Sequence, residues 1–325
     1  MHQTRPCAEG VKGSMTAVLY SFIYLGVLAF LIGSIARAVR YARTPTHLRW
    51  ELYPVPHEEA KRAEHGGSYF EESDWWTKST NFSLWGELKA MVPEMAFLKG
   101  LWEFNRPMWL RSFPFHFGLY LVAVSIALVL LTAMVSLVAP SLMAAPVAAA
   151  LHYLYTSVGL LGAVLVVAGA LGLLVKRLTD DKLKNYTAPG DLFNLLFFIA
   201  TFGLLIAGYA LRPPGSPGAL KLAVGVLTFD TTLQAPPLMS AGLIIGAVLA
   251  AYIPLTHMSH FVGKYFTYHS VRWDDQPAVK SEKLRRRVAE YLTYRPTWAA
   301  SHVGANGTKT WAEIATTNPA QEARK

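Results

Sequence analysis

The chain has 325 residues, of which 53% are hydrophobic and only 16% are charged, and its mean hydropathy is +0.29. Soluble domains carry about 25% charged residues on average, so this composition indicates a polytopic membrane protein with polar extensions. The net charge of +9 does not indicate a nucleic-acid partner, because most of the excess basic residues follow or precede the apolar segments on one side of the membrane.

Five apolar segments are long enough to cross a hydrocarbon core, which takes about 20 helical residues. We therefore predict an all-α integral membrane protein, a five-transmembrane-helix bundle with a cytoplasmic loop domain and a cytoplasmic C-terminal tail. The predicted spans are 15–40, 112–138, 148–176, 191–211 and 236–263. The other segments are an outer N-terminal segment 1–14, the loop 41–111, an outer loop 212–235 and the tail 264–325.

The distribution of Lys and Arg predicts the orientation. The loops 139–147 and 212–235 carry only Arg212, Lys221 and Asp230, whereas the segments at the opposite ends of the spans are rich in Lys and Arg. Basic residues favour the cytoplasmic side. We therefore expect the N-terminus outside and the C-terminus in the cytoplasm.

Within the loop 41–111, residues 83–104 are amphipathic at roughly helical spacing, with an expected break at Pro93. Such a stretch either lies along the membrane interface or belongs to a packed cytoplasmic subdomain. Either arrangement leaves a surface for a partner.

The only cysteine is Cys7. One cysteine cannot hold an iron–sulfur cluster, so a partner must hold any cluster with which this chain exchanges electrons.

Histidines at matching depths are the main functional signal, since ionisable side chains are costly in lipid. His116 is five residues beyond Arg111, about 7–8 Å into its span, and His260 is four residues before Lys264, about 6 Å from the same side. Facing imidazoles on two helices suit the axial ligands of a b-type haem. His257, one turn deeper, is the alternative ligand, and two interfacial histidines bonded to backbone or water are the structural alternative.

His152 starts the third span, 24 residues before Lys176, and therefore lies about 36 Å away near the opposite membrane face. It cannot ligate the same haem as His116. A titratable imidazole near Tyr155 suits quinol binding, because quinol oxidation releases protons. Axial ligation of a second, outer haem and an interfacial aromatic belt are the alternatives.

These segments resemble the gamma subunit of respiratory nitrate reductase, a five-span cytochrome b. The resemblance rests on FHFGLYLVAVSI, on PLTHMSHFVGKY and on the stretch from GALGLLVKRLTDDK to LLIAGYAL. It implies that His116 and His260 ligate the haem nearest the cytoplasm and that His152 occupies the position of a basic quinol-site residue. The outer-haem ligands of that family would fall at Ile126 and Gly242. We therefore expect one haem b and leave a second open.

The motif THLRWELYPVPHE, Thr46 to Glu58, resembles a branch of the superfamily found in transmembrane redox complexes of sulfate reducers and related anaerobes. This resemblance implies a cytoplasmic iron–sulfur partner subunit similar to heterodisulfide reductase, and a bacterial or archaeal cytoplasmic membrane. The charged and imidazole residues of the motif are His47, Arg49, Glu51 and His57. They could orient haem propionates or dock the partner, and the structural alternative is a Pro-rich loop.

The sequence thus predicts a membrane cytochrome b subunit that relays electrons between menaquinone or ubiquinone and the iron–sulfur partner. Arg111 and Lys264 are expected to neutralise haem propionates, since a buried anion needs a counter-charge. The competing hypothesis is a cofactor-free membrane anchor or a transporter. Transporters usually show broken spans and internal repeats, and here Pro254 is the main interruption within a span.

Overall fold

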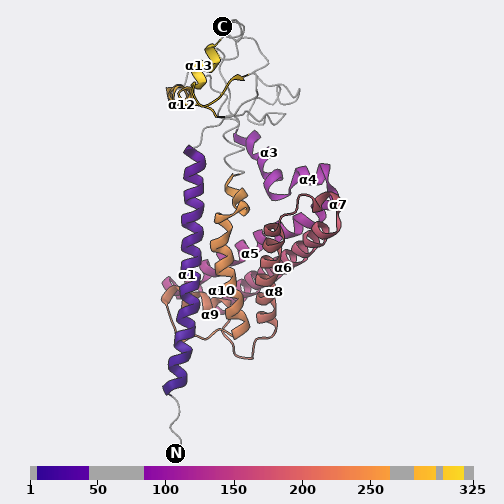
Figure 1. The fold of residues 1–325 in the computed structure, drawn as a ribbon. Coiled ribbons are helices and arrows are strands. Elements are labelled where there is room, and N and C mark those ends of the chain that lie inside the picture. Colours follow the sequence, from indigo (N-terminus) through magenta and orange to yellow (C-terminus); the bar gives the residue numbers. More distant parts are fainter. Residues whose placement is uncertain (1–5, 44–83, 264–281, 298–302, 318–325) are drawn as a thin grey trace, which may run out of the picture. The chain divides into compact units, whose positions relative to one another are not determined.

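The computed structural model describes residues 6–43, 84–263, 282–297 and 303–317. The chain divides into two compact units, one comprising residues 1–39 and 88–263 and the other 40–87 and 264–325. The larger unit contains the long helices shown in Figure 1. They are α1 Pro6–Arg43, α5 Arg106–Val138, α6 Ala145–Thr179, α8 Pro189–Ala210 and α10 Pro237–Tyr252.

The predicted all-α membrane bundle is confirmed. Five helices are long and apolar enough to span a membrane: Met15–Arg43, Arg106–Val138, Ala145–Thr179, Pro189–Ala210 and Pro237–Leu255. Many of their large apolar side chains lie exposed, among them Leu25 at 65% and Ile126 at 54%. Such an apolar surface requires lipid rather than water around it. The molecule is a multi-pass membrane protein.

The second long helix begins six residues before the predicted span, at Arg106. The side chain of Asn105 accepts a hydrogen bond from the backbone N–H of Met108 at 3.2 Å, and Pro107 lies in the first turn. An Asn cap followed by a proline is a favoured helix start. Between the spans lie the short apolar helix α9, Ala219–Thr228, and the four-residue helix α7, Asp181–Lys184.

The fifth span is helical over a shorter stretch than 236–263. Helix α10 ends at Tyr252, and two 3-10 turns follow, η4 Ile253–Leu255 and η5 His257–Ser259. Pro254 has no N–H and its ring clashes with the carbonyl four residues earlier, which ends a regular α-helix. Thr256 starts the second turn by accepting a hydrogen bond from the N–H of Met258 at 3.3 Å. His257 therefore lies in a short 3-10 turn, and His260 begins the helical stretch 260–263 that follows it.

The break expected at Pro93 is wrong. Helix α3, Leu84–Ala96, runs through this proline, and Phe97 N–H still bonds the Pro93 carbonyl at 3.1 Å. The break comes at Leu98, which has left-handed backbone angles (φ 53°), and helix α4, Lys99–Phe104, follows it. Pro93 removes one backbone hydrogen bond and crowds the carbonyl four residues earlier, but α3 continues past it to Ala96, and the chain changes direction at the left-handed Leu98.

Small residues bring the helices of the larger unit into direct contact. A Cβ on Gly118 of α5 would lie 2.6 Å from the carbonyl oxygen of Gly162 in α6. Similar close approaches join α8 to α10 at Gly242, α1 to α10 at Gly26, and α1 to the turn η4 at Gly33. Membrane helices associate through such small residues because lipid provides no hydrophobic drive between them. The order of neighbours is α5, α6, α8, α10 and α1.

The smaller unit contains helices α12, Glu282–Leu292, and α13, Trp311–Thr316. Helix α12 carries Arg285 and Arg286, each paired with Glu282, at 2.5 and 3.1 Å. Helix α13 begins with a capping box, in which Thr310 and Glu313 bond each other's backbone N–H groups at 3.2 and 2.6 Å. Most of the predicted loop domain, residues 44–83, lies outside the described residues.

Candidate functional site

His116 lies in α5 with its ring orientation fixed by the preceding turn. Its Nδ1 is 2.8 Å from the carbonyl oxygen of Ser112 and 3.3 Å from the Ser112 hydroxyl. A ring nitrogen bonded to a carbonyl oxygen must donate, so Nδ1 carries the hydrogen and Nε2 keeps its lone pair. Buried Phe115 packs edge-on against the imidazole at 5.3 Å. The ring is therefore prepared as a ligand through Nε2.

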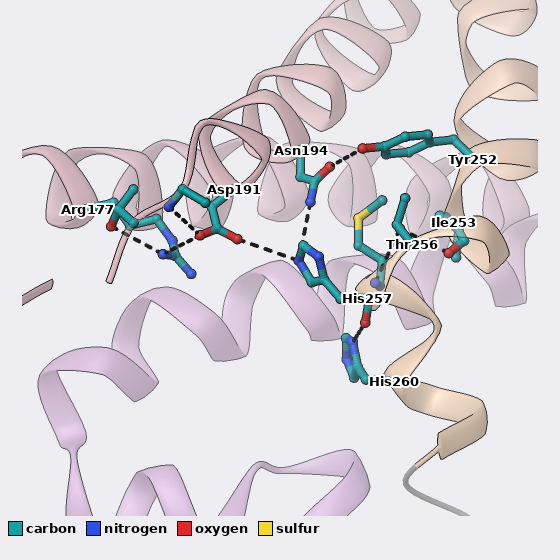
Figure 2. A network of polar contacts seen from close by, with 11 residues as sticks. Arg177, Asp191, Asn194, Tyr252, Ile253, Thr256, His257 and His260 are labelled. Atoms are coloured by element: carbon teal, nitrogen blue, oxygen red, sulfur yellow. Dashed lines mark hydrogen bonds and ion pairs between the residues drawn. The ribbon is translucent and has the colours of Figure 1, made fainter. Parts of the chain in front are cut away.

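His260 directly follows the 3-10 turn η5. Its Nδ1 is 3.4 Å from the carbonyl oxygen of His257, so this ring also has Nδ1 turned to a carbonyl (Figure 2). The preceding 3-10 turn η4 is held from α1, because Arg37 Nε donates to the carbonyl oxygen of Pro254 at 2.8 Å. That carbonyl is one that the interrupted helix leaves without its usual partner.

The His116 and His260 rings contact each other in an edge-to-face arrangement between α5 and the end of the fifth span. Their centroids are 6.1 Å apart, with 67° between the ring planes. Imidazoles that bind one metal ion from opposite sides, with metal–nitrogen distances near 2 Å, have centroids about 6 Å apart. Metal-bound histidines also typically donate their other N–H to a carbonyl, as both rings do here. The pair thus fits the axial ligands of a haem.

A haem needs fewer protein ligands than a metal site built from side chains alone. Over the described ranges, no three His, Cys, Asp or Glu side chains are grouped closely enough to hold a metal ion. A haem iron takes four ligands from its porphyrin and needs only two from the protein. Two histidines at this separation match that requirement.

His257 belongs to a different polar network (Figure 2). Its Nε2 lies 3.3 Å from Asn194 Nδ2 and 3.6 Å from a carboxylate oxygen of Asp191. Asp191 in turn bonds the backbone N–H of Ala188 at 3.0 Å and pairs with Arg177 at 3.3 Å. This network joins α6, α8 and η5. Because its Nε2 is engaged there, His257 is placed less well than His260 to ligate a metal beside His116.

Sequence reasoning did not identify Asp191, Asn194, Tyr252 or Arg37 as members of a site. The Tyr252 hydroxyl donates to Asn194 Oδ1 at 2.9 Å, and Asn194 is only 6% exposed. A signal did exist, since buried amides within an apolar span are costly unless they are bonded. Their partners, however, are 58 and 63 residues away in sequence, so only the fold connects them.

Four cations mark one end of the bundle, called the basic end below: Arg37 in α1, Arg111 in α5, and Lys176 and Arg177 in α6. The predicted propionate partner Arg111 lies one turn before His116 along α5, and its side chain covers Gly172 of α6. The predicted partner Lys264 and the motif residues His47, Arg49, Glu51 and His57 lie outside the described residues.

The predicted quinone residues His152 and Tyr155 do lie together. His152 Nδ1 is 3.0 Å from the Tyr155 hydroxyl, and Tyr155 is buried at 2% exposure. Gly169 of α6 packs against Phe115, beside His116. His152 is 17 residues from Gly169, about 25 Å along the helix. The pair is therefore at the end of the bundle opposite the basic end.

Ile126 and Gly242, the two positions considered above for ligands of an outer haem, carry no ligating side chain. A Cβ on Gly242 would lie 2.9 Å from a methyl carbon of Leu205 and 3.1 Å from its backbone nitrogen. Helices α8 and α10 thus touch at this level. Ile126 of α5 is 54% exposed on the outside of its helix.

Fold and site together define the class: this is an all-α, multi-pass membrane protein with a pair of facing histidines near the basic end of its bundle. Comparison with protein-family models, curated proteins and solved structures finds no match to this chain.

Proposed function

We propose that this protein is a membrane cytochrome b, the electron-transfer subunit of a quinone-linked oxidoreductase. The observation that carries the proposal is the 6.1 Å separation of the His116 and His260 rings, each with Nδ1 turned to a backbone carbonyl. Two interfacial histidines could also bond backbone carbonyls, so the ring separation carries the proposal and the carbonyl bonds only support it.

In this proposal His116 and His260 hold one haem b, and His257 stays in its own network. The haem supplies a one-electron carrier within the membrane. Arg111 and Lys264 would supply positive charges for the haem propionates. The contact between α8 and α10 at Gly242 favours one haem per chain.

Electrons would pass between membrane menaquinone or ubiquinone and a cytoplasmic iron–sulfur subunit similar to heterodisulfide reductase. Two features support a separate partner for the clusters: the chain has a single cysteine, and its basic helix α12 presents paired and exposed Arg side chains. The Lys and Arg residues at the basic end support a cytoplasmic orientation for that end and for the C-terminal tail.

A reduced-minus-oxidised spectrum of the purified protein, expressed with haem supplied, tests the proposal. We expect the bands of a low-spin b-type haem, and extraction should give one haem per chain. Two haems per chain would require further ligands, with His152 as the first to examine. A colourless protein with native helix content would overturn the proposal in favour of a cofactor-free anchor or transporter.

A further inference from the structure

We infer that His257, set by Asn194 and Tyr252, forms a binding site for the head group of a quinone at the basic end of the bundle. This inference deepens the proposed function, on which it rests, because it names where the quinone binds. Figure 2 shows the three side chains linked in one chain of hydrogen bonds.

The hydrogen-bond order determines which nitrogen of His257 is available. Tyr252 donates its hydroxyl hydrogen to Asn194 Oδ1 at 2.9 Å, which turns the amide nitrogen toward the imidazole. Asn194 Nδ2 then donates to His257 Nε2 at 3.3 Å, whereas the Asp191 oxygen, at 3.6 Å, is beyond hydrogen-bond length. With Nε2 accepting, Nδ1 carries the hydrogen.

This Nδ1–H is a donor without a partner in the part of the chain that the structure describes, and the His257 side chain is 68% exposed. The Nδ1–H group of His257, held in one orientation at the edge of a membrane span, suits a ligand whose carbonyl oxygen can accept a hydrogen bond. Its orientation is already fixed by two buried or half-buried groups, so binding costs little ordering of the protein.

Aromatic rings of α8 lie at the Tyr252 end of this network. Phe193 and Phe197 of α8 contact the Tyr252 ring, with centroids 5.8 and 5.7 Å away. Phe193 is 52% exposed. Aromatic faces offer offset or edge-on contacts to a planar ring, and an isoprenoid tail can extend from there into lipid. The ligand best suited is thus planar, carries a carbonyl and has an apolar tail.

The charges beside the donor favour a neutral ligand over a phospholipid phosphate. The carboxylate of Asp191 lies 3.6 Å from Nε2 of the same imidazole, and it pairs with Arg177 at 3.3 Å. A phosphate at Nδ1 would approach this carboxylate, whereas a quinone carbonyl carries no net charge. The site also lies close to the proposed haem ligand, since the His257 carbonyl contacts His260 at 3.4 Å.

The pair His152–Tyr155 lies far from the proposed haem, about 25 Å along α6 from the level of His116. Electron tunnelling weakens steeply with distance, so a quinone bound there could not exchange electrons efficiently with a haem at the basic end. A quinone bound at His257 would lie close to the proposed haem, so electrons would not have to cross this distance.

The test is direct binding of 2-heptyl-4-hydroxyquinoline N-oxide, a planar quinol analogue with an alkyl tail, to the full-length protein in phosphatidylcholine nanodiscs. Calorimetry gives the dissociation constant, and haem per chain is counted separately. We expect His257→Ala to raise the dissociation constant about tenfold, as for loss of one hydrogen bond, without loss of haem. Tyr252→Phe, which keeps the ring, should give a smaller rise, and His152→Ala should give none.

The outcomes separate the two proposals. A protein that lacks haem but binds the analogue through His257 would overturn the proposed function and leave the binding site standing. Full haem with unchanged binding in both His257→Ala and Tyr252→Phe would overturn the site alone. Weakened binding in His152→Ala alone would move the site to the opposite end. Displacement of the analogue by phosphatidylglycerol in the nanodiscs would identify a lipid head-group site instead.

Discussion

The Nδ1 of His116 lies 2.8 Å from the carbonyl oxygen of Ser112, one helical turn earlier. A carbonyl oxygen has two lone pairs, so this group can serve the helix backbone and the imidazole together. The ring of His116 is thereby oriented by its own helix before any ligand arrives. The partner ring of His260 depends on a distant contact, because its turn is held from α1 by Arg37.

We predict that His116→Ala and His260→Ala each abolish haem binding, because each removes one of the two proposed axial ligands. His257→Ala should retain the haem, since its Nε2 faces Asn194 rather than His116. The measurement is the haem content per chain with the reduced-minus-oxidised spectrum. Loss of haem in His257→Ala, together with retention in His260→Ala, would show that the ligand assignment is wrong.

Gly169 should not tolerate a side chain. A Cβ there would lie 2.7 Å from Phe115 Cα, so Gly169→Ala must push α6 away from α5 beside His116. Overpacking of this kind costs about 1–3 kcal/mol, which thermal unfolding in detergent should show as a lower midpoint. Gly203→Ala is the matched control, because a Cβ there meets nothing within 4 Å, and it should leave the midpoint unchanged or raise it. Equal midpoints for the two variants would contradict this account.

Arg37 should stabilise the interrupted end of the fifth span. Its Nε donates to the Pro254 carbonyl at 2.8 Å, and Arg37→Ala leaves that acceptor without its side-chain donor. We expect a loss of about 1–3 kcal/mol and a weaker hold on haem, measured as the rate of haem transfer to an apo-globin. Arg37→Lys keeps a positive charge and a donor and should recover part of both. Wild-type haem retention in Arg37→Ala would show that α1 does not position His260.

Asp180 should make stability depend on pH in the acid range. The hydrogen bond from Lys176, at 2.6 Å, and those from the backbone N–H groups of Leu183 and Lys182 hold the pKa of Asp180 below its ordinary value of 3.8. A carboxylate with a lowered pKa stabilises the fold above that ordinary value, and the contribution disappears as pH falls through the lowered pKa.

Unfolding midpoints measured from pH 6 down to about pH 3 test this prediction, since the ordinary Asp pKa lies within that range. Asp180→Asn should be less stable than wild type at pH 6, and the difference should shrink as the medium becomes more acidic. Asp181→Asn, at a neighbouring side chain that is 93% exposed, controls for the loss of one charge. A difference that stays constant over the whole range would contradict the prediction.

Sequence reasoning located the long helices because membrane spans are encoded locally. About 20 consecutive apolar residues must form a helix in lipid, where each backbone polar group needs an internal partner. The same reasoning placed His116 and His260 at similar depth, since helical rise is constant. It placed the break near residue 93 incorrectly, because the left-handed backbone at Leu98 leaves no strong signal in the sequence.

The apolar composition and helical spacing of this chain thus determined that five helices span a membrane and which histidines share a level. Only the tertiary structure decided which ring faces which partner. The direction of a side chain around a helix axis depends on how helices pack, and here Gly118, Gly169 and Gly33 set those contacts. That packing turns His260 toward His116 and leaves His257 with Asn194, although the two histidines are three residues apart in one short segment.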